Sequence, residues 1–128
     1  MRISKSEIPA KINVPGAIGR VAANFGDVSN FSKMAGEYFS LGAGTDLGPL
    51  LLGLKDDVCH APHWGYMLAG ELVVTYLDGT EDTCKEHDLF YWPPGHTLRV
   101  VEDAEVVLFS PQHEHGQVMD HMLAKMQG

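Results

Sequence analysis

The sequence lacks any run of about 18 apolar residues, which a membrane-spanning helix would need. It also lacks a basic excess, because Lys and Arg number 9, Asp and Glu number 17, and the formal net charge is -8. A nucleic-acid-binding protein normally presents a basic face to the phosphates, so no nucleic-acid partner is expected. No membrane partner is expected either, because the chain has no polybasic stretch.

Cysteine is also scarce, with Cys59 and Cys84 the two in the chain. Two cysteines are too few for the disulfide framework of a small secreted domain, so a reducing, cytoplasmic setting is expected. A single bridge between the two remains open at this stage. The N-terminus has no apolar stretch after its first basic residue, so no signal peptide is expected.

Histidine, by contrast, is abundant, with 7 in 128 residues. Histidine is the commonest metal ligand among side chains, which is the first reason to look for a metal site. The remaining composition, 45% hydrophobic and 20% charged, is that of an ordinary globular protein. The length suits one domain whose core needs no disulfide.

Short β-forming segments separated by turn residues fill the middle of the chain. The clearest is 67–77, where β-branched and aromatic residues alternate before the tight-turn pair Asp78-Gly79. The other expected strands cover residues 18–22, 36–42, 47–54, a segment ending near 85, 89–92, 97–101 and 105–109, with Glu102-Asp103 as a turn between the last two. No βαβ alternation is present, so the pattern predicts an all-β sandwich or barrel.

The C-terminal end is expected to be a helix. Ser110 suits its N-cap and Pro111 its first helical position, and methionines recur at helical spacing beyond them. We interpret this methionine stripe as packing against the barrel. The expected organisation is a single domain with an N-terminal arm at 1–33, a barrel at 36–110 and the helix at 111–127.

Two segments gather most of the metal-binding residue types. The first runs from Asp57 to Leu72 and contains Pro-His-Trp-Gly-Tyr-Met-Leu-Ala-Gly-Glu-Leu, and the second is Asp-Leu-Phe-Tyr-Trp-Pro-Pro-Gly-His, which ends at His96. Together they resemble the two short motifs of the cupin superfamily. The first family motif has two histidines separated by one residue, then a glutamate and a glycine, and the second is Pro-x-Gly-x-x-His. The resemblance implies a double-stranded β-helix, the cupin jelly-roll barrel, in which both segments aim ligands at one metal ion.

In the first segment, Gly70 matches the motif glycine. Counting back along the motif puts His63 where the family has glutamate, Cys59 at the second histidine and Asp57 at the first. All three ligand positions implied by the resemblance are therefore filled by residues that can bind a metal, but by other residue types than the family has there.

In the second segment, Pro93 and Gly95 match the motif, and the expected histidine falls on Leu98. His96 lies two residues earlier. Because positions two apart on a strand share a face, His96 can still reach the interior of the barrel.

Alternation along the strands gives a separate test of these positions. If His63 faces inward, Met67 faces inward too, whereas Trp64 and Tyr66 face the second layer or a partner subunit. On this count His60 points away from the interior, unless the proline that follows it bends the segment.

The smallest expected ligand set is Cys59, His63 and His96, which suits Zn2+ with water in a fourth position. Adding Asp57 gives two histidines and a carboxylate, which suits Fe2+ instead. Zn2+ is favoured over Fe2+ because thiolate is more often a zinc ligand, and His60 is a further candidate ligand. Each of these residues also has a structural alternative, as a buried cysteine, a hydrogen-bonded core histidine or a turn residue.

The expected pocket walls come from four apolar or aromatic residues, Met67, Tyr91, Phe39 and Leu98. Three histidines on or before the C-terminal helix are expected in solvent: His113, His115 and His121.

Three functions fit these features. The first is a metal-dependent enzyme acting on a small molecule, for which the cupin resemblance implies a dioxygenase or an isomerase. The second is a non-catalytic metal or small-molecule sensor, and the third is a metal-free cupin in which a histidine is the general acid or base. Three protein ligands favour catalysis, and four or more favour structure or sensing. The resemblance also implies a homodimer, whereas the substrate and the catalytic residues stay unassigned.

Overall fold

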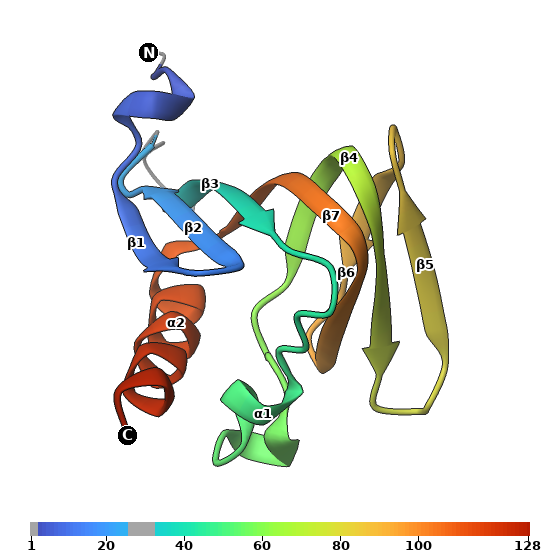
Figure 1. Ribbon diagram of the computed structural model, residues 1–128. Helices are drawn as coiled ribbons and strands as arrows, with labels where there is room; N and C mark the ends of the chain where they lie inside the picture. Colours follow the sequence, from blue (N-terminus) through green and yellow to red (C-terminus); the bar gives the residue numbers. More distant parts are fainter. Residues whose placement is uncertain (1–2, 26–32) are drawn as a thin grey trace.

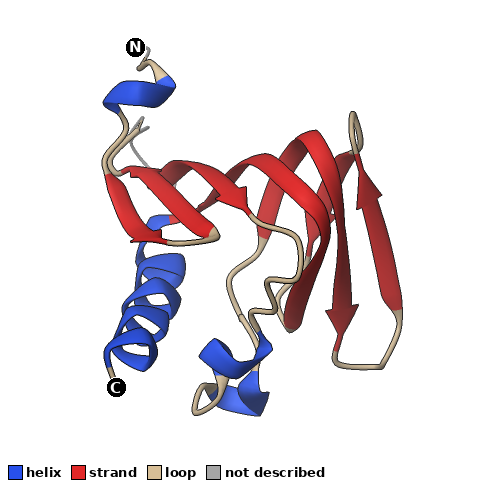
Figure 2. Cartoon of the chain, viewed as in Figure 1, coloured by secondary structure: helices blue, strands red, loops and turns tan. Residues whose placement is uncertain are grey.

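The computed structural model describes residues 3–25 and 33–128 and is mostly antiparallel β-sheet with a helix at the C-terminal end (Figures 1 and 2). The strands are β1 (Ala10–Val14), β2 (Ala17–Ala22), β3 (Met34–Leu41), β4 (His63–Tyr76), β5 (Glu81–Lys85), β6 (Leu89–Trp92) and β7 (His96–Pro111). The helices are α1 (Gly48–Leu51) and α2 (Gln112–Gln127), with 3-10 turns η1 (Lys5–Glu7) and η2 (Lys55–Asp57). Within these ranges no helix combines the length and apolar character needed to cross a membrane. Residues 26–32 of the expected N-terminal arm lie outside the described residues.

The strands form one sheet in the order β1-β2-β3-β7-β4-β5, with β6 paired to β4 beside this path. The two longest strands, β4 and β7, pair antiparallel from Trp64 opposite Phe109 to Tyr76 opposite His96. Strand β6 pairs with the first half of β4 and β5 with the second half. The prediction of an all-β jelly-roll class with a C-terminal helix is confirmed.

Gly70 allows the β4–β7 pair to bend in its middle. Its φ is +84°, and a Cβ added there would lie 2.1 Å from the carbonyl oxygen of Asp103. The register between the strands shifts on both sides of this point, as at a β-bulge. The predicted turn at Glu102-Asp103 is therefore wrong: both residues are exposed on a bend inside the continuous strand β7.

Two predictions near the helices are also wrong. The expected strand at 47–54 contains helix α1, because Pro49 stands in its first turn, where a missing N–H costs no hydrogen bond. The Asp46 carboxylate accepts the N–H of Gly48 at 2.9 Å and so supports this start. Ser110 does not cap the C-terminal helix, because it is buried within β7 and α2 begins at Gln112.

The core has two parts, one inside the sheet and one under the helices. The second contains Leu51 of α1 and the buried side of the α2 methionine stripe, including Met119 and Met122. The stripe therefore packs on the core as expected. Cys59 and Cys84 are both buried and free, so they form no bridge.

Candidate metal centre

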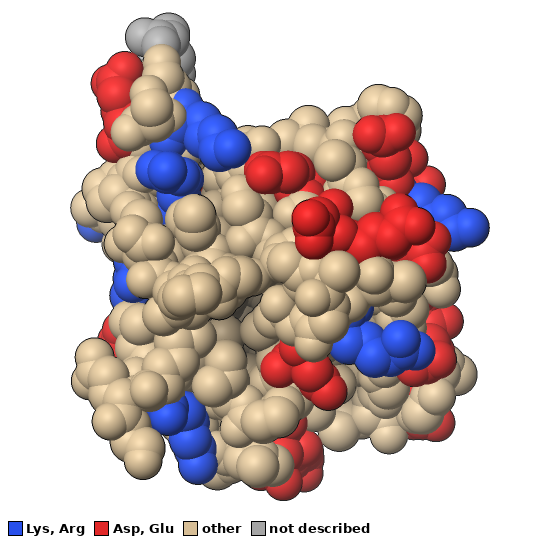
Figure 3. All heavy atoms as spheres, viewed as in Figure 1, with Lys and Arg blue, Asp and Glu red and all other residues tan. Residues whose placement is uncertain are grey.

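A cavity of about 280 Å³ opens between the sheet and the two helices. Its walls come from β1 to β4, β6, β7, α1, α2 and the segments between them. The lining side chains with polar atoms are Thr45, Thr97, Cys59, His63, His96, His115 and, through its indole N–H, Trp92. Figure 3 shows a hollow near the middle of this face, bordered mainly by residues other than Lys, Arg, Asp and Glu.

Cys59 and His96 are opposite each other across an antiparallel bridge. The N–H of Cys59 donates to the His96 carbonyl at 2.8 Å, and the N–H of His96 donates back to Cys59 at 3.2 Å. Residues paired in this way project their side chains to the same side of a sheet. The backbone pairing thus places the thiol and the imidazole together, although 37 positions separate the two residues in sequence.

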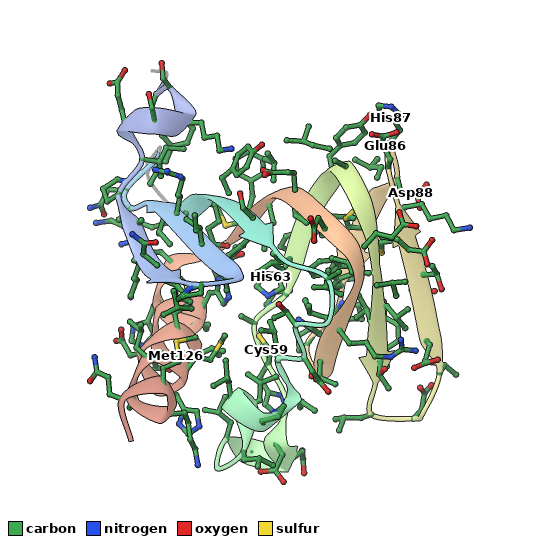
Figure 4. All side chains as sticks on the ribbon, viewed as in Figure 1. Cys59, His63, Glu86, His87, Asp88 and Met126 are labelled. Carbon is green, nitrogen blue, oxygen red and sulfur yellow. The ribbon has the colours of Figure 1, made fainter. Side chains whose placement is uncertain are left out.

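His63 is the first residue of β4 and supplies the third side chain of the cluster. Its Nε2 lies 3.6 Å from the Sγ of Cys59, and the two residues are drawn side by side in the middle of the molecule (Figure 4). One ligand atom each from Cys59, His63 and His96 lie within 4.8 Å of one another, and all three residues are buried. Such a cluster has the dimensions of a metal site.

Hydrogen bonds on the far side of both imidazoles decide which nitrogen is available. The Nδ1–H of His96 donates to the carbonyl of Pro93 at 2.8 Å. The hydroxyl of Ser110 donates to Glu37, so its oxygen accepts the Nδ1–H of His63 at 2.6 Å. In the neutral rings Nε2 is therefore the nitrogen that carries the lone pair, as a metal ligand requires.

Glu37 lies at the centre of a buried network that the sequence did not indicate. It is 3% exposed, and its carboxylate accepts hydrogen bonds from Ser110 and from the Nδ1 of His115, the latter at 2.5 Å. Hydrogen bonds of this kind orient metal-ligating histidines in known centres. Glu37, His63 and His115 also form a second cluster of possible ligand atoms that shares His63 with the first.

The prediction that His115 lies in solvent is wrong. It is 6% exposed, lines the cavity and lies with its ring centroid 4.3 Å from that of His63. Helical spacing was the available signal, since His115, Val118 and Met122 fall on one face of α2. For Glu37 the signal was alternation along β3, which puts it on the same face as Phe39.

Burial keeps Cys59 as a thiol at neutral pH. Removal from water raises the pKa of Cys59 to about 11, an effect reinforced by Glu37 and opposed by the contact with the Ala61 carbonyl. A metal ion that binds this sulfur must therefore displace a proton.

Burial has the opposite effect on the two histidines. It holds the pKa of His63 well below the ordinary value, helped by the neighbouring His115 and His96. It lowers the pKa of His96 to about 4, against the opposing hydrogen bond to Pro93. Both rings are accordingly neutral at physiological pH and ready to donate a lone pair.

The distance between two of the three donors suits a tetrahedral ion. Zn–S bonds of about 2.3 Å and Zn–N bonds of about 2.0–2.1 Å, set at a tetrahedral angle, put sulfur and nitrogen about 3.6 Å apart. This equals the 3.6 Å between Sγ of Cys59 and Nε2 of His63. A thiolate with two imidazoles is a soft to borderline set, which suits zinc better than magnesium or calcium.

Two of the sequence-predicted ligands lie outside this cluster. Asp57 is exposed and its carboxylate accepts the N–H of Gly53 at 2.9 Å, because a left-handed backbone at Asp57 turns the segment outward. His60 is half-exposed, and its Nε2 bonds to the carbonyl of Lys55 at 2.8 Å. Without a carboxylate from Asp57, the set loses the two-histidine, one-carboxylate character that pointed to iron.

Two of the four expected pocket residues line the cavity and two do not. Phe39 and Leu98 line the cavity. Met67 is fully buried in the sheet core, and Tyr91 is 49% exposed and stacked on Trp64 outside the sheet.

The other histidines lie away from the cluster. His113 is exposed, and His121 bonds to the carbonyl of Leu52 at 2.7 Å. His87 lies with Glu86 and Asp88 in the turn between β5 and β6, at the upper right edge of the molecule in Figure 4 and away from Cys59 and His63.

Comparison of the chain with solved structures gives matches across most of its length. Ectoine synthase from P. lautus matches with a TM-score of 0.59 and 13% identity, over 87% of this chain and 78% of that one. The polyketide cyclase RemF from Streptomyces resistomycificus matches with a TM-score of 0.57 and 14% identity, over 87% of this chain and 78% of that one. Salicylate 1,2-dioxygenase from Pseudoaminobacter salicylatoxidans matches at 0.54 and 18% identity, over 88% of this chain but 29% of that one.

These neighbours are cupin-fold proteins, and the chain has the cupin fold. The resemblance inferred from the two sequence motifs is thereby confirmed at the level of fold. No protein-family model and no curated protein sequence matches the chain.

Proposed function

We propose that Cys59, His63 and His96 bind one divalent metal ion, and that the protein uses it in a reaction on a small molecule held in the cavity. The observation that carries this proposal is the cluster of three buried ligand atoms within 4.8 Å of one another in a cavity wall. Three protein ligands leave a coordination position of a four-coordinate ion for water or substrate, which is typical of catalytic rather than structural zinc.

We favour Zn2+ over Fe2+ because the set contains a thiolate and no carboxylate. When bound, such an ion acts as a Lewis acid on a carbonyl or lowers the pKa of a bound water. This chemistry supports an isomerase-type or hydrolytic reaction better than a dioxygenase, because Zn2+ is not redox-active.

The chain's own residues orient the His63 ring, exclude water from the cavity and provide a group that can accept a proton. Ser110 and Glu37 hold the ring of His63 in one tautomer. The apolar walls keep water away from the reacting group, which strengthens every electrostatic interaction there. The Nε2 of His115 has no part in the bond to Glu37 and belongs to the same cavity wall, so we assign it the role of proton acceptor.

Metal analysis of protein purified without added metal, and again after incubation with Zn2+ or Fe2+, tests the proposal. We expect about one ion per chain in the wild type and in Cys84→Ala, which alters the other buried thiol, and a much lower ion content in purified Cys59→Ala and His63→Ala, which bind the ion more weakly. Circular dichroism checks that each variant folds. A wild type that folds but takes up neither ion would overturn the proposal and favour the metal-free acid–base function.

We also propose that the protein is a homodimer in a reducing, cytoplasmic compartment. Trp64 on β4 stacks on Tyr91 at 5.2 Å and pairs in register with Phe109, and all three side chains are more than 40% exposed. An exposed aromatic face of this kind is typical of an interaction surface. Sedimentation velocity tests the homodimer. A wild-type protein that stays monomeric at micromolar concentration would contradict it.

A further inference from the structure

The chemistry of the cavity walls narrows the class of substrate. We infer that the site takes an uncharged small molecule with an apolar body and a hydroxyl or carbonyl head, the head lying toward Cys59, His63 and His96. This inference rests on the proposed function, since it concerns the same cavity. A volume of about 280 Å³ lies just below the usual range for ligand pockets, which suits a molecule of roughly one or two rings.

The walls of the cavity carry no Lys, Arg, Asp or Glu side chain among the described residues. A carboxylate, phosphate or ammonium group placed there would lose its hydration without an ionic side chain to replace it, and burying an unpaired charge is costly.

The buried Glu37 side chain counts against a carboxylate head on the substrate. Glu37 is 3% exposed and lies just behind His63 through Ser110. A carboxylate beside His63 would bring a second carboxyl group into the same buried region, and two carboxyl groups that share such a site cannot both ionise without a cost. A neutral oxygen carries no such cost.

The wall contains a neutral hydroxyl that no described protein group satisfies. Thr97 lines the cavity, and its hydroxyl is buried with no hydrogen-bond partner among the described residues. A buried hydroxyl left without a partner is destabilising, because it has lost its hydrogen bonds to water without replacing them. A hydroxyl or carbonyl on the substrate is the kind of neutral group that such a side chain binds.

The body of the substrate is apolar because the rest of the wall is apolar. Sheet strands contribute rigid side chains such as Phe39, Leu72 and Leu98, and α2 contributes Met119 and Met122. Methionine is flexible and polarisable, so this side of the cavity can adjust to flat or branched bodies. The cavity therefore selects against charge more strongly than it selects for shape.

A matched pair of probes tests the inference: 2-naphthol, which is neutral at neutral pH, and 2-naphthoate, which has the same ring system but carries a carboxylate. Trp92 lines the cavity and reports binding by its fluorescence once the exposed Trp64 is replaced in Trp64→Phe. We expect 2-naphthol to bind metal-loaded Trp64→Phe about tenfold or more tightly than 2-naphthoate. Equal or tighter binding of 2-naphthoate would overturn the inference, as would failure of 2-naphthol to bind below millimolar concentration.

A second variant tests whether the lack of charge in the wall causes the preference for 2-naphthol over 2-naphthoate. Met122→Lys in the same background places an ammonium in the cavity wall, and we expect it to reverse the preference toward 2-naphthoate. Leu123→Lys, on the same helix but outside the lining, is the control and keeps the neutral preference. An unchanged preference in a folded Met122→Lys contradicts the inference. If Met122→Lys does not fold, the comparison of the two probes on Trp64→Phe still decides it.

The same titrations separate this inference from the proposed function. Protein that binds no metal but still prefers 2-naphthol refutes the metal centre and leaves the neutral cavity standing. Protein that binds about one ion yet prefers 2-naphthoate refutes the neutral substrate and leaves the metal centre standing.

Discussion

The hydroxyl oxygen of Ser110 lies 2.6 Å from Nδ1 of His63, and the same hydroxyl donates a hydrogen bond to the carboxylate of Glu37. Strand β7 thus links a carboxylate on β3 to an imidazole on β4. All three residues are at most 3% exposed, so water cannot substitute for any of these bonds. The link fixes the tautomer of His63 and makes Ser110 a positioning residue for the proposed metal centre.

Ser110→Ala should weaken Zn2+ binding by about 10- to 100-fold, the usual effect of losing such a supporting hydrogen bond. The ring of His63 would then lose its acceptor and Glu37 one of its donors, so a loss of stability of about 1–3 kcal/mol should accompany the effect. Competition with a metal chelator measures the affinity, and urea denaturation measures the stability.

The matched control is Ser40→Ala. Ser40 lies on β3 and its hydroxyl bonds to Glu105 at 3.0 Å, away from the cluster. It should leave Zn2+ affinity unchanged. If Ser110→Ala binds Zn2+ as tightly as the wild type does, the Ser110 link has no part in positioning His63.

The affinity for Zn2+ should rise with pH. The pKa of Cys59 is about 11, whereas the pKa of His96 is about 4 and that of His63 lies well below its ordinary value. Between about pH 6 and pH 8 the thiol is therefore protonated and both imidazoles are neutral, so binding to the thiolate releases one proton. The affinity should increase about tenfold for each pH unit over this range.

Chelator competition at several pH values measures this slope, with a chelator of known pH dependence as the reference. Cys59→Ala should bind more weakly and lose the slope, because its remaining nitrogen ligands release no proton in that range. A wild-type affinity that does not change with pH would mean that Cys59 binds no metal as thiolate.

Much of the fold could be predicted because its signals are local. The alternation in 67–77 and the turn at Asp78-Gly79 act over a few residues and agree with β4, β5 and the turn between them. The turn predicted at Glu102-Asp103 is wrong for a non-local reason. The partner strand decides whether two acidic residues end a strand or lie on a bend within it. Here Gly70 on β4 lies opposite them and makes the bend possible.

The residues of the candidate site also divide into those with a local sequence signal and those without one. Cys59, His63 and His96 stand out in the sequence because they fall in or next to two compact motifs. Glu37 and Ser110 are 73 positions apart and meet through the pairing of β3 with β7, which no short window of sequence contains. Their side chains acquire a role only once the strands are paired.

The bend at Gly70 gives a prediction with an internal control, because two glycines share a backbone conformation but differ in surroundings. Gly70 and Gly79 have φ values of +84° and +86°. A Cβ at Gly79 would meet nothing within 4 Å, whereas one at Gly70 would lie 2.1 Å from Asp103 oxygen and 2.7 Å from Ala104 Cα.

Gly79→Ala should therefore lower the free energy of unfolding by about 1–2 kcal/mol, the cost of a left-handed backbone for a residue with a side chain. Gly70→Ala should lower it by about 3 kcal/mol or more, because backbone atoms on β7 must also move. Urea denaturation of the two variants measures the difference. Equal losses would show that the β4–β7 bend accommodates a side chain, and the close approach of Gly70 to β7 would then not be what the fold requires.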